Sequence, residues 1–140
     1  MSLYLDTSVV VALLTEDPLN LRASVFLQGS SETLIISDFG SAEFSAVVAR
    51  RVRMGTITPD HGRAALAIFD AWTARTAHRV RISSEDVAVA DSYLRRLDLT
   101  LLTPDALHIA IAARIGATIV TFDRAMAASA RVLGMAVTTP

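Results

Sequence analysis

Short aliphatic runs alternate with helical patterns along the whole chain, and this alternation limits the possible folds more than any other feature. It is typical of βαβ units, in which helices join parallel strands and cover both faces of the sheet. The sequence therefore predicts an α/β fold, a three-layer α/β/α sandwich with a central, mainly parallel sheet. The predicted strands span residues 3–5, 34–36, 80–82 and 118–121, with a weaker fifth at 136–138. The predicted helices span residues 8–14, 19–28, 39–54, 59–77, 85–97, 104–115 and 124–133.

Capping residues mark several of the predicted helix ends. Two Thr-Pro pairs each place a hydroxyl before a proline at the first helical position, and two glycines suit left-handed helix stops. These residues are Thr58-Pro59, Thr103-Pro104, Gly116 and Gly134.

The length and composition favour one soluble domain. The chain has 140 residues, of which 52% are hydrophobic, enough for one buried core, so we expect a single domain over residues 1–140. No apolar stretch reaches the ~18 uncharged residues that indicate a membrane span. We therefore expect a cytoplasmic protein without membrane contact. The chain has no cysteine, so any bound metal must accept carboxylates, which favours Mg²⁺ or Mn²⁺ over zinc.

Two aspartates directly follow predicted strands. Ligands of open parallel sheets bind beyond the carboxyl ends of the strands, where Asp6 and Asp123 are expected to lie. Aspartate is also a preferred helix N-cap, so capping and a functional role remain alternatives at both positions. Near Asp6, however, Thr7 and Ser8 could supply the cap, so capping alone does not require an acid there.

Two further acids lie on helices of apolar character. Glu43 interrupts a segment of small and apolar residues and has no basic residue three or four positions away. Such a carboxylate is either exposed or, if buried, paired or bound to metal. Asp105 lies in the first turn of an apolar helix, where the helix dipole alone would favour it. At the same position, the carboxylate could also project into the ligand-binding crevice of the sheet.

Other polar residues fit ordinary structural roles. His108 follows Asp105 by three residues on one helical face, a spacing at which the pair could bind a metal. A lone histidine on an apolar helix is more often a hydrogen-bonded core residue, and we favour that role for His108. Asp91 and Arg95 have the spacing of a surface ion pair, so we leave Asp91 outside the site.

The basic residues are all arginines. The formal net charge is -1, so no global basic field indicates a nucleic-acid partner. Arginine nevertheless has a planar fork suited to phosphates, and Arg50, Arg51 and Arg53 on one segment predict a local patch that binds RNA backbone. The alternative is that these arginines form a solvated helix face.

The four acids, in their order and local settings, resemble those of the PIN-domain family, and in particular the VapC-type toxins of bacterial toxin-antitoxin pairs. The resemblance covers essentially the whole chain. The matching motifs are Leu5-Asp6-Thr7-Ser8, Ser41-Ala42-Glu43, Pro104-Asp105-Ala106-Leu107-His108-Ile109-Ala110 and Thr121-Phe122-Asp123. Some members carry a further acid soon after the last motif, whereas Ala125 and Met126 occupy that region here.

The resemblance implies a PIN-like fold and a Mg²⁺-dependent endoribonuclease, the toxin of a toxin-antitoxin pair, that hydrolyses RNA phosphodiester bonds; Mn²⁺ is an alternative ion. The four acids would be catalytic and hold the metal, with Asp6 and Asp105 as the most direct ligands, Asp123 direct or through water, and Glu43 as ligand or base. Thr121, and more weakly Ser8, match hydroxyl positions that help arrange metal-bound water.

The resemblance also implies partners. These are an RNA substrate, a cognate antitoxin that is a small DNA-binding protein, and a second copy of the chain in a homodimer. A non-catalytic PIN-fold binding module that acts through a protein partner is the alternative function. Phosphatases with an aspartyl nucleophile also place an acid after the first strand, but they use a lysine, and this chain has none.

Overall fold

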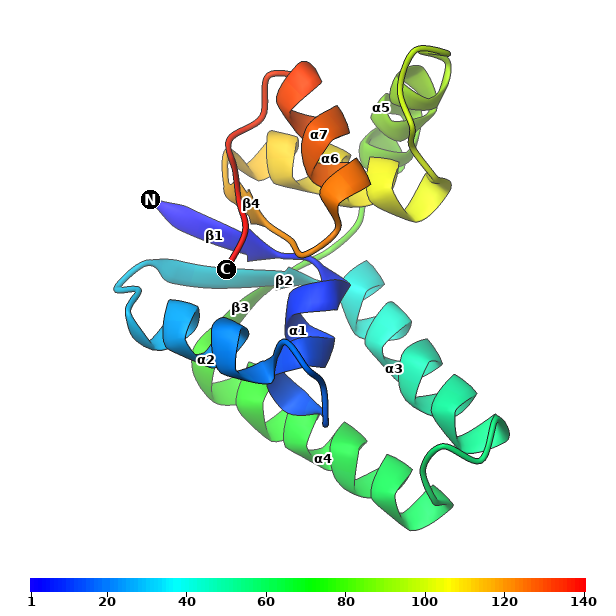
Figure 1. The fold of residues 1–140 in the computed structure, drawn as a ribbon. Coiled ribbons are helices and arrows are strands. Elements are labelled where there is room, and N and C mark those ends of the chain that lie inside the picture. The colour runs from blue at the N-terminus through cyan, green and yellow to red at the C-terminus, as the bar shows by residue number, and fades with distance from the viewer.

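The computed structural model describes residues 1–140 and has the predicted three-layer α/β/α architecture (Figure 1). Its central sheet has five parallel strands in the order β3-β2-β1-β4-β5. The strands are β1 (Ser2–Leu5), β2 (Thr33–Ser37), β3 (Ala77–Val80), β4 (Thr118–Val120) and β5 (Val137–Thr138). The helices are α1 (Thr7–Leu14), α2 (Asn20–Gln28), α3 (Asp38–Arg53), α4 (Pro59–Thr76), α5 (Ser84–Leu94), α6 (Thr103–Ile115) and α7 (Arg124–Val132).

The helices form two layers. In Figure 1, α1 to α4 lie on one side of the sheet and α5 to α7 on the other. Side chains of each strand alternate between these layers. In β1, Leu3 and Leu5 belong to the core that includes α1, α3 and α4, whereas Tyr4 belongs to the core with α6 and α7. The central strand is therefore buried on both faces.

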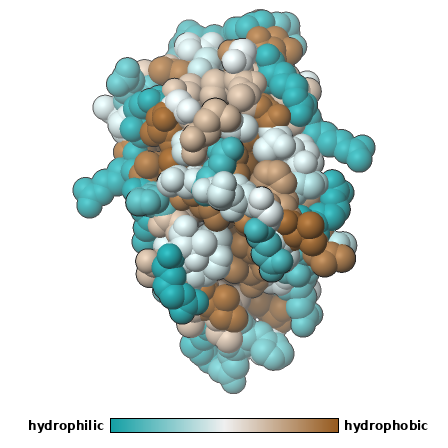
Figure 2. Space-filling model, turned by 90° about the vertical axis from the view of Figure 1, so that its left-hand side faces the viewer, coloured by the Kyte–Doolittle hydropathy of each residue, from teal (hydrophilic) through white to brown (hydrophobic).

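The outer surface is mixed in character. Figure 2 views the molecule from the side where β1 begins, and its hydrophobic residues are scattered among hydrophilic ones. None of the helices combines the length and the apolar character that crossing a membrane requires.

Most predicted helix ends are confirmed. The Thr58 hydroxyl accepts a hydrogen bond from the His61 N–H at 3.2 Å, and Gly116 and Gly134 have φ angles of 66° and 84°. The prediction that Thr103 caps α6 was wrong. Helix α6 begins at Thr103 itself, and its N-cap is Leu102, whose backbone N–H donates to Asp105 Oδ2 at 3.2 Å.

The bounds of the predicted third strand were wrong: β3 covers Ala77–Val80, so it begins three residues and ends two residues before the predicted 80–82. This strand lies at the edge of the sheet and pairs with β2 alone. An edge strand does not need a continuous apolar run, so exposed His78 and Arg79 can occupy it. The residues of the predicted strand instead lie at and just after the end of β3, where the side chains of Val80 and Ile82 pack against the core with α6 and α7.

A buried carboxylate joins α5 to α6. Asp86 is 1% exposed and receives two hydrogen bonds from Arg114, from Nε at 2.7 Å and from Nη2 at 2.9 Å. The Ser83 N–H donates to the same carboxylate at 2.8 Å. Arg114 also donates to the Arg81 carbonyl at 2.8 Å, so one side chain connects α6, α5 and the segment after β3.

We predict that Arg114→Met lowers the free energy of unfolding by about 1.5–3 kcal/mol, because it leaves a buried carboxylate without its charged donor. Arg95→Met is the matched control, since Arg95 pairs with Asp91 at 2.8 Å on the surface and such pairs contribute about 0.2–1 kcal/mol. Urea denaturation of both variants measures the difference. Equal losses would mean that burial of Asp86 adds nothing to this ion pair.

Candidate functional site

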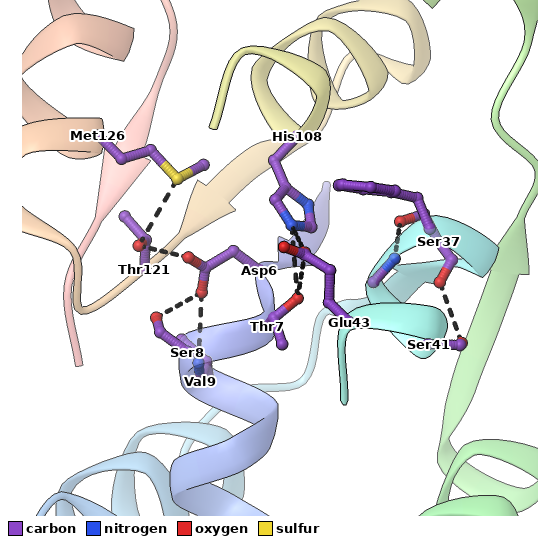
Figure 3. A network of polar contacts seen from close by, with 12 residues as sticks. Asp6, Thr7, Ser8, Val9, Ser37, Ser41, Glu43, His108, Thr121 and Met126 are labelled. Atoms are coloured by element: carbon purple, nitrogen blue, oxygen red, sulfur yellow. Dashed lines mark hydrogen bonds and ion pairs between the residues drawn. The ribbon is translucent and has the colours of Figure 1, made fainter. Parts of the chain in front are cut away.

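Asp6 lies at the carboxyl end of β1 and is 5% exposed. Its Oδ1 accepts hydrogen bonds from the Ser8 hydroxyl at 2.6 Å and the Val9 N–H at 3.2 Å, and its Oδ2 accepts one from the Thr121 hydroxyl at 2.7 Å (Figure 3). Asp6 is thus the N-cap of α1, which confirms the capping role weighed from the sequence. Burial raises the pKa of Asp6, and these hydrogen bonds do not offset it fully.

Asp123 is connected to Asp6 through Thr121. The Thr121 hydroxyl donates to Asp6 and accepts a hydrogen bond from the Asp123 N–H at 2.9 Å. Asp123 Oδ1 caps α7 by accepting from the Met126 N–H at 2.9 Å. The two acids that follow β1 and β4, which are neighbouring strands, are therefore both helix caps at one edge of the sheet.

Asp105 lies close enough to these two acids to feel their charges. Burial raises the pKa of Asp105, and the negative charges of Asp123 and Asp6 raise it further against opposing contributions from the Leu102 N–H and His108. None of the three aspartates forms an ion pair with an arginine. Three like charges thus lie near one another without an arginine to compensate them, and His108 is the basic side chain that opposes their effect on Asp105.

Glu43 has a different environment from the aspartates. Its Oε1 accepts hydrogen bonds from the Thr7 hydroxyl at 2.6 Å and from His108 Nε2, and its side chain is 27% exposed (Figure 3). Burial acts to raise the pKa of Glu43, but the hydrogen bond and charge of His108 and the hydroxyl of Thr7 outweigh burial and lower it. Glu43 is joined to the aspartates through Thr7, next to Asp6, and through His108, one turn after Asp105.

The donor set fits a hard divalent cation. Carboxylate oxygens are the ligands that Mg²⁺ prefers. The hydrogen bonds described above occupy one oxygen each of Asp105, Asp123 and Glu43 and leave the other oxygen of each free. No three acids or histidines converge as a complete metal cluster, so ligation would require these side chains to turn toward one another.

The predicted supporting hydroxyls act on Asp6. Ser8 and Thr121 both donate to this carboxylate, and Ser8 also accepts from the Phe122 N–H at 3.1 Å, which connects α1 to the segment after β4. A role of either hydroxyl in arranging water stays a prediction. Asp91 pairs with Arg95 at 2.8 Å, as predicted, outside the site.

The predicted arginine patch lies at the far end of α3 from its capped N-terminus. Arg50 and Arg53 are exposed, whereas Arg51 is half-buried and lies 4.0 Å from Asp17. At 1.5 Å per residue, Arg50 is about 10 Å along the helix from Glu43. The two residues are seven positions apart and so share one helical face. Binding of RNA by these arginines stays a prediction.

Sequence reasoning missed two residues of this network, Thr7 and Tyr4, and the contact of His108 with Glu43. His108 is 3% exposed and hydrogen-bonded, so the predicted core role is confirmed. It is nevertheless also the partner of a predicted site residue. The available signal was the spacing of Asp105 and His108 on one helical face, which did not indicate that the partner acid comes from α3.

The family model of the PIN domain matches residues 3–132 of this chain. The chain belongs to the PIN domain family. No curated protein sequence gives a significant match.

Solved structures share the PIN fold of this chain. VapC20 of Mycobacterium tuberculosis, described as a sarcin-ricin loop cleaving toxin, has a TM-score of 0.76 at 20% identity and covers 99% of both chains. A chain of VapBC2 from Rickettsia felis, solved with a fragment of promoter DNA, has a TM-score of 0.75 at 17% identity over 100% of this chain and 99% of that chain. A chain of DNA-bound VapBC from Salmonella typhimurium has a TM-score of 0.72 at 16% identity, over 99% of this chain and 98% of that chain. At these identities the likeness shows the fold.

Asp105 and Asp86 offer a matched test of the acidic site, because each is the third residue of a helix and accepts the N–H of the N-cap residue. The pKa of Asp105 is raised, whereas Arg114 and Ser83 outweigh burial and lower the pKa of Asp86. A carboxylate with a raised folded pKa destabilises the protein as pH rises, and one with a lowered pKa stabilises it above its unfolded pKa.

We therefore predict opposite effects of the two asparagine variants in chelator at neutral pH. Asp105→Asn should stabilise the protein, and Asp86→Asn should cost about 1.5–3 kcal/mol. Both differences should shrink as pH falls below the usual carboxylate pKa of about 4. Urea denaturation across this pH range tests the signs, and a loss of stability in Asp105→Asn at neutral pH would identify Asp105 as a purely structural cap.

Proposed function

We propose that this PIN domain is a metal-dependent endoribonuclease and the toxin of a toxin-antitoxin pair. The observation that carries the proposal is the group of three aspartates at the carboxyl edge of the sheet, where Asp105 feels the charges of Asp6 and Asp123 and no arginine compensates them. Clustered carboxylates without an ion-pair partner are costly unless a cation binds. The likeness to a toxin that cleaves the sarcin-ricin loop supports RNA as the substrate.

The site residues would have different roles in metal binding and catalysis, according to their environments. Asp6, Asp105 and Asp123 would hold Mg²⁺, or Mn²⁺ in its place, and Glu43 would act as ligand or base. Bound there, the cation would polarise a phosphate and lower the pKa of an attacking water. Ser8 and Thr121 hold Asp6 in one orientation through hydrogen bonds of 2.6 and 2.7 Å. No side chain needs to form a covalent bond with the substrate.

The purified chain, freed of any bound partner, should cleave RNA with Mg²⁺ or Mn²⁺ and lose this activity in excess chelator. Asp6→Asn and Asp105→Asn should each reduce cleavage by more than the ~10–100-fold typical of losing a residue that only orients a ligand. Gel assays of single-turnover cleavage measure these losses. Asp91→Asn is the control, since Asp91 lies in a surface ion pair outside the site.

Two outcomes would contradict this assignment. Undiminished cleavage in chelator would exclude the metal mechanism. Absence of cleavage by folded, metal-loaded protein against any RNA, together with tight binding of a partner protein, would favour the alternative of a non-catalytic binding module.

The partners follow from the same proposal. Several similar structures are VapBC complexes bound to DNA, which supports a cognate antitoxin that is a small DNA-binding protein. A homodimer of this chain is proposed on the family resemblance alone. Localisation in the cytoplasm, where RNA substrates occur, is proposed with the function.

The arginines of α3 are proposed to bind the RNA backbone. If Arg50, Arg51 and Arg53 each neutralise a phosphate, the triple alanine variant should weaken binding of all sequences and flatten the dependence of log K on log salt by about 0.7 per single-stranded phosphate lost. Binding titrations at several salt concentrations, done in chelator to prevent cleavage, measure the slope.

The matched control replaces Arg95 and Arg96, which are both exposed and paired with their own acids, Asp91 and Asp98, at 2.8 Å. This variant should leave the slope unchanged. A triple α3 variant with the wild-type slope would assign these arginines to a solvated helix face.

A further inference from the structure

His108 of α6 contacts one residue of the central sheet and one residue of the opposite helix layer. Its Nδ1 lies 2.7 Å from the hydroxyl of Tyr4 in β1, and its Nε2 is hydrogen-bonded to Glu43 Oε1 in α3. The imidazole is 3% exposed and also packs against the rings of Tyr4 and Phe39, with centroids 5.7 and 5.1 Å apart. The ring is thus fixed by packing against two aromatic rings and by hydrogen bonds at both nitrogens, and Figure 3 shows it beside Glu43.

The direction of each hydrogen bond follows from the groups involved. Glu43 is a carboxylate and can only accept, so His108 Nε2 carries the hydrogen. In the neutral imidazole Nδ1 is then an acceptor, and the Tyr4 hydroxyl donates to it. The Tyr4 oxygen can in turn accept from the Ser37 hydroxyl at 2.8 Å, whose oxygen accepts from the Gly40 N–H at 2.9 Å.

These bonds form a closed circuit through α3. Ser37 is the N-cap of α3, the helix that also carries Glu43. A continuous series of hydrogen bonds therefore runs from the first turn of α3 through Tyr4 and His108 and returns to the same helix at Glu43, one turn later. Tyr4 is fully buried in the central strand and gives the circuit a rigid anchor. The Glu43 carboxylate is therefore oriented by side chains from β1 and α6 as well as by its own helix.

We propose that His108, backed by Tyr4, is a positioning residue that holds Oε1 of Glu43 and leaves only Oε2 to serve the metal site. The proposal rests on the proposed nuclease function. Thr7 is the second donor to Oε1, at 2.6 Å, so both donors hold the same oxygen and neither holds Oε2. Partners that orient a ligand in this way typically contribute 10–100-fold to metal affinity or activity.

Two amide variants at one position separate positioning from packing. In His108→Gln the amide nitrogen stands where Nε2 stood and can still donate to Glu43. In His108→Asn the amide reaches only as far as Nδ1 and can contact Tyr4 alone. We expect the asparagine variant to lose about 10–100-fold in kcat and in Mg²⁺ affinity, with KM for RNA unchanged, and the glutamine variant to retain most of both.

Three further variants distinguish positioning of Glu43 from a general loss of stability. In a Glu43→Ala background, His108→Asn should cause no additional loss of kcat, because it acts through Glu43. Ser129→Ala removes a buried hydroxyl that donates to the Thr100 carbonyl at 3.3 Å, away from the site, and should lower Tm without changing kcat. Tyr4→Phe removes one hydroxyl and provides the test if His108→Asn fails to fold; it should lower kcat and Mg²⁺ affinity with KM unchanged.

A readout independent of activity completes the test. Nitrogen NMR of labelled histidine, assigned by comparison with His108→Gln, should show the neutral His108 ring as a single tautomer with the hydrogen on Nε2, and Glu43→Ala, which removes the acceptor at Nε2, should mix the tautomers. Equal losses in the glutamine and asparagine variants that follow their Tm, or a hydrogen on Nδ1 alone, would overturn the positioning role. If the wild type cleaves no RNA, the proposed function fails, whereas the tautomer and the Mg²⁺ affinities of the two amide variants still decide the positioning proposal.

Discussion

The site depends on taking the charge of Asp6 out of water at the end of the central strand. A buried carboxylate is tolerated only where donors replace its hydration, and here Ser8, Val9 and Thr121 do so. These donors come from α1 and from the end of β4, so satisfying one charge also fixes where two neighbouring strands end. Thr121 in turn accepts from the Asp123 N–H, which extends the constraint to the start of α7. The position of Asp123 follows from this arrangement.

Much of the fold could be predicted because local signals and tertiary packing agree in most elements. Parallel strands buried on both faces must be continuously apolar, and helices that cover them must be apolar on one side, so both leave clear patterns. The sequence pattern gave wrong bounds for elements whose side chains need little burial in the core. The edge strand β3 contains exposed His78 and Arg79, and its position is set by pairing with β2 and not by its own composition. Similarly, Leu102 ends up as a helix cap because Asp105 reaches back to its N–H.

The candidate site could be predicted in part for a related reason. Acids that follow strands, or that interrupt apolar helices, stand out along the chain, and all four lie near the carboxyl edge of the sheet. The pairing of Glu43 with His108 could not be read in the same way, because the two residues are 65 positions apart and on different helices. Tyr4 shows the same limit more strongly. In the sequence it is one more apolar strand residue, and only the fold places its hydroxyl between Ser37 and His108.

Glu43 and the aspartates differ in how far their surroundings stabilise the negative charge, and this difference separates their roles in the site. His108 and Thr7 already stabilise the charge of Glu43 and lower its pKa, whereas the pKa of Asp105 is raised by burial and by its neighbours Asp123 and Asp6. A bound cation would relieve most repulsion where negative charge is least compensated, so the aspartates would provide the main driving force for its binding. Glu43 would add less, since hydrogen bonds already stabilise its charge. The contribution of Glu43 would then be geometric, set by the buried Tyr4 and His108 side chains that orient its carboxylate.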